Sequence, residues 1–179
     1  ALVQLAAEND GDGLAKPLAE RPEIAIIDYT GGPFFGAWLE QHGAASGQLV
    51  FTEKAGVNTV VIDSTDNLKG MLGNLAFSFT LFSGQMCTTP QNVYVQAEVP
   101  TDEGVLTFDE IADRIGAAVA RFTADDAKAV EMLGATVNPQ VRANAAALEQ
   151  IASDADGRVV LASREVAHPA YPDAVSRAP

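Results

Sequence analysis

The chain has 179 residues, of which 47% are hydrophobic and 20% charged, a composition typical of a globular protein with a sizeable core. Its 24 acidic and 11 basic residues give a formal net charge of −13, which disfavours nucleic acids and anionic membranes as partners. The single cysteine excludes an internal disulfide framework and suits a cytoplasmic location, and two isolated histidines provide no zinc-ligand spacing, so we expect no metal site.

The first third of the chain predicts an alternation of strands and helices. We expect, in chain order, a strand over residues 1–7, a turn over 8–13, a short helix over 14–21, a strand over 23–29, a helix over 34–42 and a strand over 49–52. The near-continuous apolar run of 23–29 is typical of a strand that is covered on both faces of a parallel sheet. This order predicts part of an open α/β sheet, in which ligands bind beyond the carboxyl ends of the strands.

A glycine-containing turn follows the strand over 23–29. Thr30-Gly31-Gly32-Pro33 lies at its carboxyl end, where glycines let the backbone approach a ligand and the next helix offers N–H groups to an anion. The alternative is a plain tight turn between a strand and a helix, because the segment is not a G-x-G-x-x-G fingerprint. The residues alone leave both interpretations open.

The rest of the chain predicts further strands and a series of helices. We expect a strand over 57–63, a helix over 67–82 with N-caps at 64–66, a strand to about residue 97, a polar loop over 100–104, helices over 107–122, 124–133 and 139–155, a strand over 158–162, and an irregular tail that contains three prolines. Apolar residues surround the whole of the helix over 67–82, as in a buried helix. Thr107 and Glu110 form a capping-box pattern, and the helix that they open has a stripe predicted to be buried: Ile111, Ile115, Ala118 and Val119.

The only cysteine, Cys87, lies between a long apolar segment and a strand-like alternation. Gly84 precedes it and Pro90 follows it, a setting that favours presentation of the thiol over packing. Thiolates are nucleophilic, and backbone N–H groups at a chain reversal can activate a thiol and hold a developing oxyanion. The alternative is a buried structural cysteine, because a free cysteine behaves as a small hydrophobic residue.

Three short segments occur in one order along the chain: Tyr29-Thr30-Gly31-Gly32, Glu53-Lys54-Ala55-Gly56-Val57-Asn58 and Gly84-Gln85-Met86-Cys87. Together they resemble the aldehyde dehydrogenase superfamily, in which a Phe-Thr-Gly-Ser type turn, a Glu-Leu-Gly-Gly-Lys type segment and a Gly-Gln-x-Cys motif follow one another. The resemblance extends over essentially the whole chain. It is strongest to the phenylacetate-degradation proteins called PaaN, through residues 53–59 and 83–92.

The resemblance implies that the chain is a central segment of a longer α/β enzyme. Residues 1–55 would be the C-terminal part of a Rossmann-like dinucleotide-binding domain, and residues 56–179 the N-terminal part of the catalytic domain. The family's oxyanion-hole asparagine and its Glu-x-Phe cofactor contact have no counterpart in this sequence. We therefore expect the segment alone to be inactive, and we expect the protein to form homo-oligomers.

The resemblance also implies a cofactor, NAD or NADP, lined by Thr30, Gly31, Gly32 and Phe35. A core position in the helix over 34–42 is the alternative for Phe35. Gly32 stands where the family usually has serine or threonine, which removes a hydroxyl donor but keeps the backbone. Two further departures from the family pattern leave the choice of cofactor and substrate open: Ala55 replaces a glycine, and Asn92 replaces a common arginine.

Two residues would carry the chemistry that the family implies. Cys87 would be the nucleophile that attacks an aldehyde, and Glu53 the general base that activates water against the resulting thioester; a solvated carboxylate at a strand end is the alternative for Glu53. In PaaN-like proteins the implied substrate is a semialdehyde of aromatic degradation, with a coenzyme A thioester as one option. The alternatives are a semialdehyde dehydrogenase that passes the acyl group to coenzyme A, and a non-catalytic scaffold.

Overall fold

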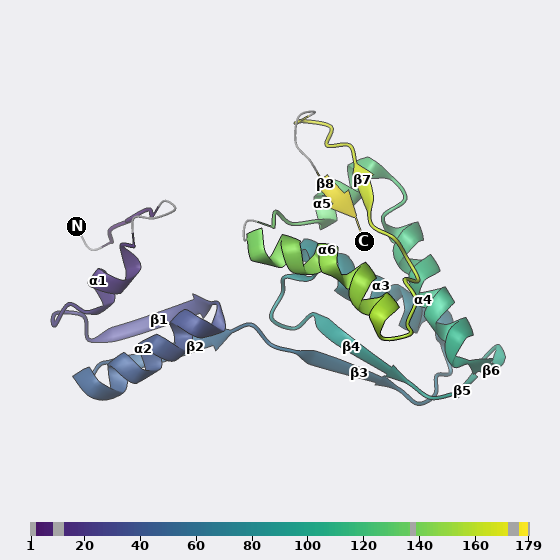
Figure 1. Ribbon diagram of the computed structural model, residues 1–179, viewed down its shortest axis with the longest axis horizontal. Coiled ribbons are helices and arrows are strands. Elements are labelled where there is room, and N and C mark those ends of the chain that lie inside the picture. Colours follow the sequence, from purple (N-terminus) through teal and green to yellow (C-terminus); the bar gives the residue numbers. More distant parts are fainter. Residues whose placement is uncertain (1–2, 9–12, 137–138, 172–175, 179) are drawn as a thin grey trace. The chain divides into compact units, whose positions relative to one another are not determined.

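The computed structural model describes residues 3–8, 13–136, 139–171 and 176–178, and its contacts divide the chain into two compact units (Figure 1). One unit spans Ala1–Gly56 and the other Val57–Pro179. Each contains helices and a parallel pair of strands, so the fold belongs to the predicted α/β class. The turn predicted over 8–13 falls largely outside the described residues.

The first unit is a parallel pair of strands joined by a helix. Its elements are α1 (Ala15–Ala19), β1 (Ile26–Gly31), α2 (Pro33–Ser46) and β2 (Leu49–Lys54). The two strands pair in parallel, from Ile26 opposite Leu49 to Gly31 opposite Lys54. Proline at the first position favours the start of α2, and the helix continues beyond the predicted end because the left-handed residue that stops it is Gly47, with φ 78°.

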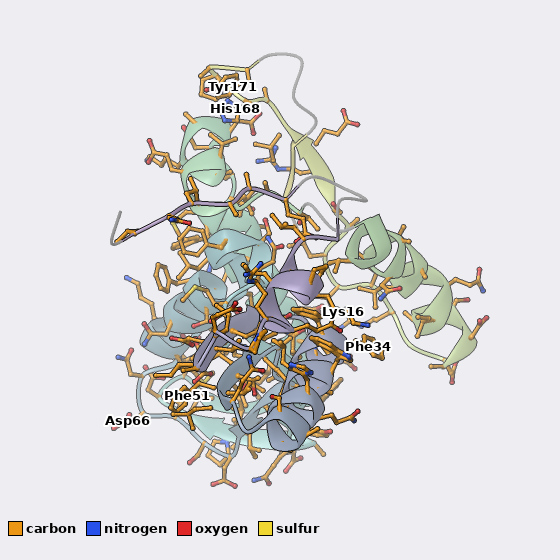
Figure 2. All side chains as sticks on the ribbon, turned by 90° about the vertical axis from the view of Figure 1, so that its left-hand side faces the viewer. Lys16, Phe34, Phe51, Asp66, His168 and Tyr171 are labelled. Carbon is orange, nitrogen blue, oxygen red and sulfur yellow. The ribbon has the colours of Figure 1, made fainter. Side chains whose placement is uncertain are left out.

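Only one face of the β1–β2 pair is covered, whereas the sequence predicts a strand buried on both faces. Residues of both strands alternate between exposed and half-buried. Ile26 is 61% exposed and Phe51, which is labelled in Figure 2, is 53% exposed. Gly36 and Gly43 bring α2 close to β2, because a Cβ on Gly43 would lie 2.3 Å from the Val50 side chain. The apolar run in β1 thus reflects burial on one side only within this chain.

An aromatic row ties α2 to its neighbours. Tyr29 of β1 contacts Phe35 edge-on, and Phe35, Trp38 and His42 stack in sequence along the helix, with ring centroids 5.2–5.4 Å apart. The Lys16 ammonium of α1 lies 4.9 Å from the centre of the Trp38 ring (Figure 2).

Residues 3–8 form no strand, so the predicted opening strand is wrong over the described residues. The side chains of this segment are exposed and have no strand partner among the described residues.

The second unit contains most of the helices. Its elements are β3 (Asn58–Ile62), α3 (Leu68–Thr80), the short 3₁₀ helix η1 (Leu81–Gly84), β4 (Pro90–Val95), β5 (Glu98–Thr101), β6 (Gly104–Thr107), α4 (Phe108–Phe122), α5 (Asp126–Met132), α6 (Pro139–Asp154), β7 (Arg164–Val166) and β8 (Ser176–Ala178). β3 and β4 pair in parallel, and β5–β6 and β7–β8 pair in antiparallel fashion. The predicted helices over 124–133 and 139–155 are confirmed within a few residues.

The core of the second unit is formed by α3, α4 and the strands beside them. Its buried residues are Ile62, Leu68, Leu72, Leu75, Ala76, Val99, Leu106, Ile111, Ala118 and Val119. The predicted capping box opens α4: Thr107 Oγ1 accepts from Glu110 N at 3.3 Å, and Glu110 Oε2 accepts from Thr107 N at 2.8 Å. The Thr107 N–H and, after it, the Thr107 hydroxyl, which donates to the same Glu110 Oε2 at 2.8 Å, lower the pKa of Glu110. The stripe predicted from the sequence faces this core.

α3 has one buried face, whereas its apolar sequence predicts burial all round. Phe77 remains 45% exposed and contacts Phe122 edge-on at 6.2 Å. The N-cap is Asn67, whose Oδ1 accepts from Gly70 N at 2.9 Å, and not one of residues 64–66. The helix ends at Thr80 because the chain then turns into η1.

β5 and β6 form a hairpin where the sequence predicts a polar loop over 100–104. Thr101 Oγ1 accepts from Glu103 N at 3.1 Å and donates to Gly104 O at 2.7 Å, and Gly104 takes a positive φ of 113°. Pro100 is tolerated because it lies in a two-stranded sheet, where one side of each strand needs no ladder hydrogen bond. The carbonyl of Pro100 instead accepts from Thr65 N at 3.0 Å.

The strand predicted over 158–162 is absent from the described structure, and a short strand occurs at β7 instead. Arg158 forms ion pairs with Asp113 at 2.7 Å and Asp109 at 3.1 Å, both on α4, and these partners raise its pKa. Val160 packs against Gly116, where a Cβ would lie 2.6 Å from the Val160 side chain. The apolar residues of this segment therefore cover α4 and do not pair as a strand.

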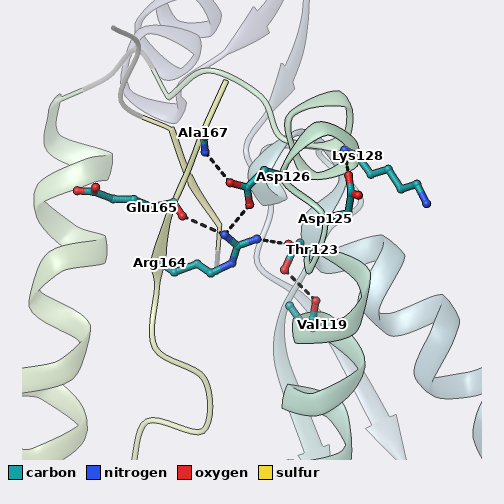
Figure 3. A network of polar contacts seen from close by, with 8 residues as sticks. All are labelled: Val119, Thr123, Asp125, Asp126, Lys128, Arg164, Glu165 and Ala167. Carbon is teal, nitrogen blue, oxygen red and sulfur yellow. Dashed lines mark hydrogen bonds and ion pairs between the residues drawn. The ribbon is translucent and has the colours of Figure 1, made fainter. Parts of the chain in front are cut away.

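A polar network links β7 to α4 and α5 (Figure 3). The Asp126 carboxylate accepts from Ala167 N at 2.9 Å and from Arg164 Nη1 at 2.7 Å. Arg164 also donates to the carbonyl of Thr123, a buried residue at the end of α4. The Ala167 N–H and, after it, the Arg164 guanidinium lower the pKa of Asp126.

None of the described helices is both long and apolar enough to cross a membrane.

Candidate active site

Cys87 is exposed and lies in a loop made of two successive turns. The first turn is closed by Gln85 N donating to Phe82 O at 3.2 Å, and the second by Thr89 N donating to Met86 O at 3.0 Å. Cys87 is the second residue of the second turn. Its exposure in this chain agrees with the presentation predicted from the flanking glycine and proline, and its role as a nucleophile stays a prediction.

The first turn is strained. Phe82 has φ 50° and Ser83 has φ 57°, and Gly84 follows with φ 70°, so three consecutive residues are left-handed. A non-glycine residue held in this region costs about 1–3 kcal/mol, and such residues persist only where the surrounding contacts hold them. Contacts from other parts of the chain must therefore hold this turn.

The segment that follows α5 holds the strained turn. Ser83 Oγ donates to Gly134 O at 3.0 Å and accepts from Gly134 N at 3.1 Å. Gln85 Nε2 donates to Phe82 O at 2.9 Å and to Ala135 O at 3.1 Å. A Cβ on Gly134 would lie 3.0 Å from Phe82 O, so the two backbones are packed as closely as glycine allows.

A third contact holds the turn that contains Cys87. Asn58, the first residue of β3, donates from Nδ2 to Cys87 O at 2.6 Å and to Thr89 O at 3.0 Å. The ladder between β3 and β4 shifts register between Asn58 and Thr59. The chain therefore leaves the turn through an irregularity that places both carbonyl groups within reach of one amide.

The other candidate residues lie in the first unit, at the carboxyl ends of β1 and β2. Thr30 is the direct partner of Glu53 in the parallel ladder, and both lie on its exposed face. The sequence predicts that the strand ends before Glu53, but in the structure Glu53 is part of β2. Lys54 points to the covered side, where its ammonium bonds Glu40 Oε1 at 2.7 Å and is the leading cause of the lowered pKa of Glu40. The structure thus brings the glycine turn and Glu53 together.

Gly31 and Gly32 join β1 to α2 without a side-chain cap on the helix. A Cβ on Gly32 would have no atom within 4 Å, so the backbone at this position is open to a ligand. The Tyr29 hydroxyl donates to Gly32 O at 3.0 Å and fixes the turn. Phe35 is half-buried between Tyr29 and Trp38, as the core alternative describes; its contact with a cofactor stays a prediction.

Glu53 lies in the first unit and Cys87 in the second, and their closeness stays a prediction. Sequence reasoning gave no role to Asn58, Ser83 or Gly134. Asn58 is visible in the second motif, but its partners are about thirty residues away in the chain, and the Ser83–Gly134 contact spans 51 residues. No group of three or more histidine, cysteine, aspartate or glutamate side chains in the described part of the chain could hold a metal ion.

Comparisons with known proteins give similarities along most of the chain. The model of the aldehyde dehydrogenase family matches residues 3–173. The crystal structure of an NAD-dependent aldehyde dehydrogenase from Burkholderia multivorans is 48% identical, with a TM-score of 0.83, over 97% of this chain and 30% of that chain. The aldehyde dehydrogenase LUC3 of a Fusarium species is 30% identical over 112 residues, 55% of this chain and 23% of its own length.

A more distant structure shares the fold. Betaine aldehyde dehydrogenase from Staphylococcus aureus, solved in complex with NAD⁺, is 16% identical, with a TM-score of 0.53, over 84% of this chain and 27% of that chain. The chain therefore spans less than a third of the length of each of these relatives.

Proposed function

The chain belongs to the aldehyde dehydrogenase family, and from this premise we propose that it supplies the nucleophile and the general base for the oxidation of an aldehyde to a carboxylic acid, with NAD or NADP as cofactor. The observation that carries the proposal is the exposed Cys87 thiol in a turn fixed by hydrogen bonds on both sides. The 48% identity to an NAD-dependent aldehyde dehydrogenase supports it. The activity is proposed for the whole protein, because the chain spans only 30% of that relative's length.

Cys87 is proposed to begin the reaction. Its thiolate attacks the carbonyl carbon, a C–S bond forms, and the carbonyl electron pair moves to oxygen. The backbone N–H of Cys87 is one donor for the resulting oxyanion. The hydrogen bonds that fix the two turns keep the thiol and this N–H in one arrangement while the charge develops.

Thr30, Gly31 and Gly32 are the residues that would hold the cofactor. The open backbone at Gly32 and the N-terminus of the 14-residue helix α2, which lacks a side-chain cap, suit an anionic phosphate. When bound, the nicotinamide supplies the acceptor for the hydride that leaves the carbonyl carbon. Phe35 is the least supported of the proposed cofactor residues, since its ring packs within the aromatic row.

Glu53 is proposed to complete the reaction. Its carboxylate takes a proton from water, the water oxygen bonds to the thioester carbon, and the C–S bond breaks to release the acid and regenerate the Cys87 thiolate. Family members that pass the acyl group to coenzyme A generally lack this glutamate. Its exposure on β2 leaves the carboxylate free to take this role and supports water as the acceptor.

Paired variants of the whole protein test these roles. We expect C87S to abolish aldehyde-dependent NADH formation, and E53Q to retain a first turnover of NADH but to lose steady-state turnover. E20Q is the matched control, because Glu20 is an exposed glutamate of the same unit, and its turnover should be unchanged. Full steady-state turnover in E53Q, or a requirement for coenzyme A as acceptor, would contradict the proposed hydrolysis.

The substrate is proposed to be a semialdehyde of aromatic degradation. The support is the resemblance of residues 53–59 and 83–92 to the PaaN proteins. Comparison of kcat/KM for simple aliphatic aldehydes, aromatic aldehydes and a semialdehyde carried as a coenzyme A thioester tests this. A preference for simple aldehydes would refute this substrate class and leave the reaction itself untouched.

A further inference from the structure

One side-chain amide holds two carbonyl groups of the turn that presents Cys87. Asn58 Nδ2 donates to Cys87 O at 2.6 Å and to Thr89 O at 3.0 Å. We propose that Asn58 is a positioning residue, which holds the Cys87 turn in the conformation from which the thiol attacks. The kinetic part of this inference rests on the proposed function.

The geometry explains why these two bonds would orient the thiol. Thr89 N and Met86 O close the turn, but this bond alone leaves the peptide between Cys87 and Thr88 free to rotate. The bond from Asn58 to Cys87 O fixes that peptide plane, and with it the ψ angle of Cys87. The bond to Thr89 O fixes the far end of the same turn, so that the turn is anchored both at Cys87 and at Thr89.

The position of Asn58 is itself fixed by the core. It opens β3, whose Val60 packs against the core and whose Ile62 is 3% exposed, and it lies opposite Pro90 at the start of β4. The amide is therefore attached to a rigid strand and not to a second loop. A donor placed in this way holds the turn with little freedom of its own.

The loop has other supports, and this separates positioning from folding. Ser83 and Gln85 anchor the first turn to Gly134 and Ala135, whether or not Asn58 is present. Loss of the Asn58 amide should therefore release the half of the loop that contains Cys87 and leave the fold intact. A stability effect and a reactivity effect are thus expected to separate.

Three variants of the whole protein test the proposal. N58L keeps the branched shape of the side chain, with bulkier methyl groups, and removes both N–H donors, whereas N58S is smaller but keeps a hydroxyl donor. N74L is the matched control, because Asn74 is an exposed residue of α3. The readouts are the rate of Cys87 alkylation by iodoacetamide as a function of pH, kcat and KM for NAD, and the urea midpoint; C87S gives the background of the alkylation assay.

We expect N58L to lower kcat by about 10- to 100-fold, as small displacements of a reacting group do, and to change the pH profile of alkylation. KM for NAD should stay the same, because the proposed cofactor residues lie in the other unit. N58S should retain more activity than N58L. A role in packing predicts the reverse order, and that order, or equal alkylation and kcat in N58L and N74L, would overturn the proposal.

Two further outcomes are decisive. If N58L does not fold, N58S decides: it overturns the proposal if it matches the unsubstituted protein in alkylation and kcat. If the unsubstituted protein oxidises no aldehyde, the proposed function fails, but alkylation needs no turnover. A difference between N58L and N74L in alkylation would then still support Asn58 as a positioning residue, and its absence would overturn it.

Discussion

Replacement of Gly134 by alanine tests whether close backbone packing holds the turn in front of Cys87. A Cβ at this position would lie 3.0 Å from Phe82 O, 3.1 Å from Phe82 Cα and 3.2 Å from Phe82 C. All three are backbone atoms, which cannot rotate away as the end of a side chain can. The substitution must therefore move residue 134 or the strained turn, and overpacking of this kind costs about 1–3 kcal/mol.

The expected effect has two parts. G134A should lower the free energy of unfolding by about 1–3 kcal/mol, measured by urea denaturation followed by circular dichroism. It should also change the rate of Cys87 alkylation, because Ser83 makes both of its hydrogen bonds to Gly134, at 3.0 and 3.1 Å. Displacement of Gly134 thus reaches the Cys87 loop through Ser83.

G73A is the matched control. Gly73 lies at an exposed position within α3, and a Cβ there would have no atom within 4 Å. Alanine is favoured over glycine in a helix interior by about 1 kcal/mol, so the same substitution should stabilise the protein. If G134A were as stable as the unsubstituted protein and its Cys87 were alkylated at the same rate, the reasoning from close packing would be refuted.

Four further predictions follow from other parts of the molecule. T107A removes the N-cap of α4 and should lower the free energy of unfolding by about 1 kcal/mol in urea; no change would mean that the capping box is unimportant. The lowered pKa of Asp126 means that its carboxylate stabilises the fold at neutral pH, and that this contribution is lost as the pH falls below the ordinary value of 3.8 and through the lowered one. D126N should therefore lower the free energy of unfolding at neutral pH. The difference in this free energy between D126N and the unsubstituted protein should become smaller in acid, as urea denaturation at several acid pH values can check. A difference that does not change with pH would contradict this. The 179 residues alone should give no aldehyde-dependent NADH, since they span 30% of the length of the Burkholderia multivorans enzyme; steady NADH formation would contradict this. The same isolated chain should self-associate through exposed apolar side chains, and a monodisperse monomer in light scattering would count against this.

Local signals in the sequence predict much of the fold. The capping box of Thr107 and Glu110 and the apolar stripe of the following helix are confirmed, because cap and stripe both depend on residues a few positions apart. The parallel β1–β2 pair also follows from the order of elements. The sequence predicts a polar loop from Pro100, but the structure has the strand β5 there. A proline in the sequence does not show whether its N–H would have been needed for pairing on that side of the strand. The apolar run over 158–162 covers α4 and does not pair, and its sequence does not distinguish the two.

In the candidate site, too, local features are predictable from the sequence and contacts between distant segments are not. The exposure of Cys87 agrees with one of the two interpretations that its sequence allows, the one favoured by the nearby Gly84 and Pro90, which are local features. The contacts that fix its loop come from Asn58 and Gly134, and no local pattern predicts them, because each joins segments that only the folded chain brings together. The left-handed conformation of Phe82 is likewise held by the contacts with Gly134 and Ala135, since its own side chain disfavours it.

The most direct test of the central claim is to look for the acyl group on Cys87. The E53Q variant of the whole protein is incubated with NAD and aldehyde, quenched in acid and mapped by mass spectrometry. We expect a thioester on the peptide that contains Cys87, accumulating because water is not activated, and no adduct in the C87S variant. Oxidation of the aldehyde with no adduct at Cys87, or with an adduct at another residue, would contradict the assignment of Cys87 as the nucleophile.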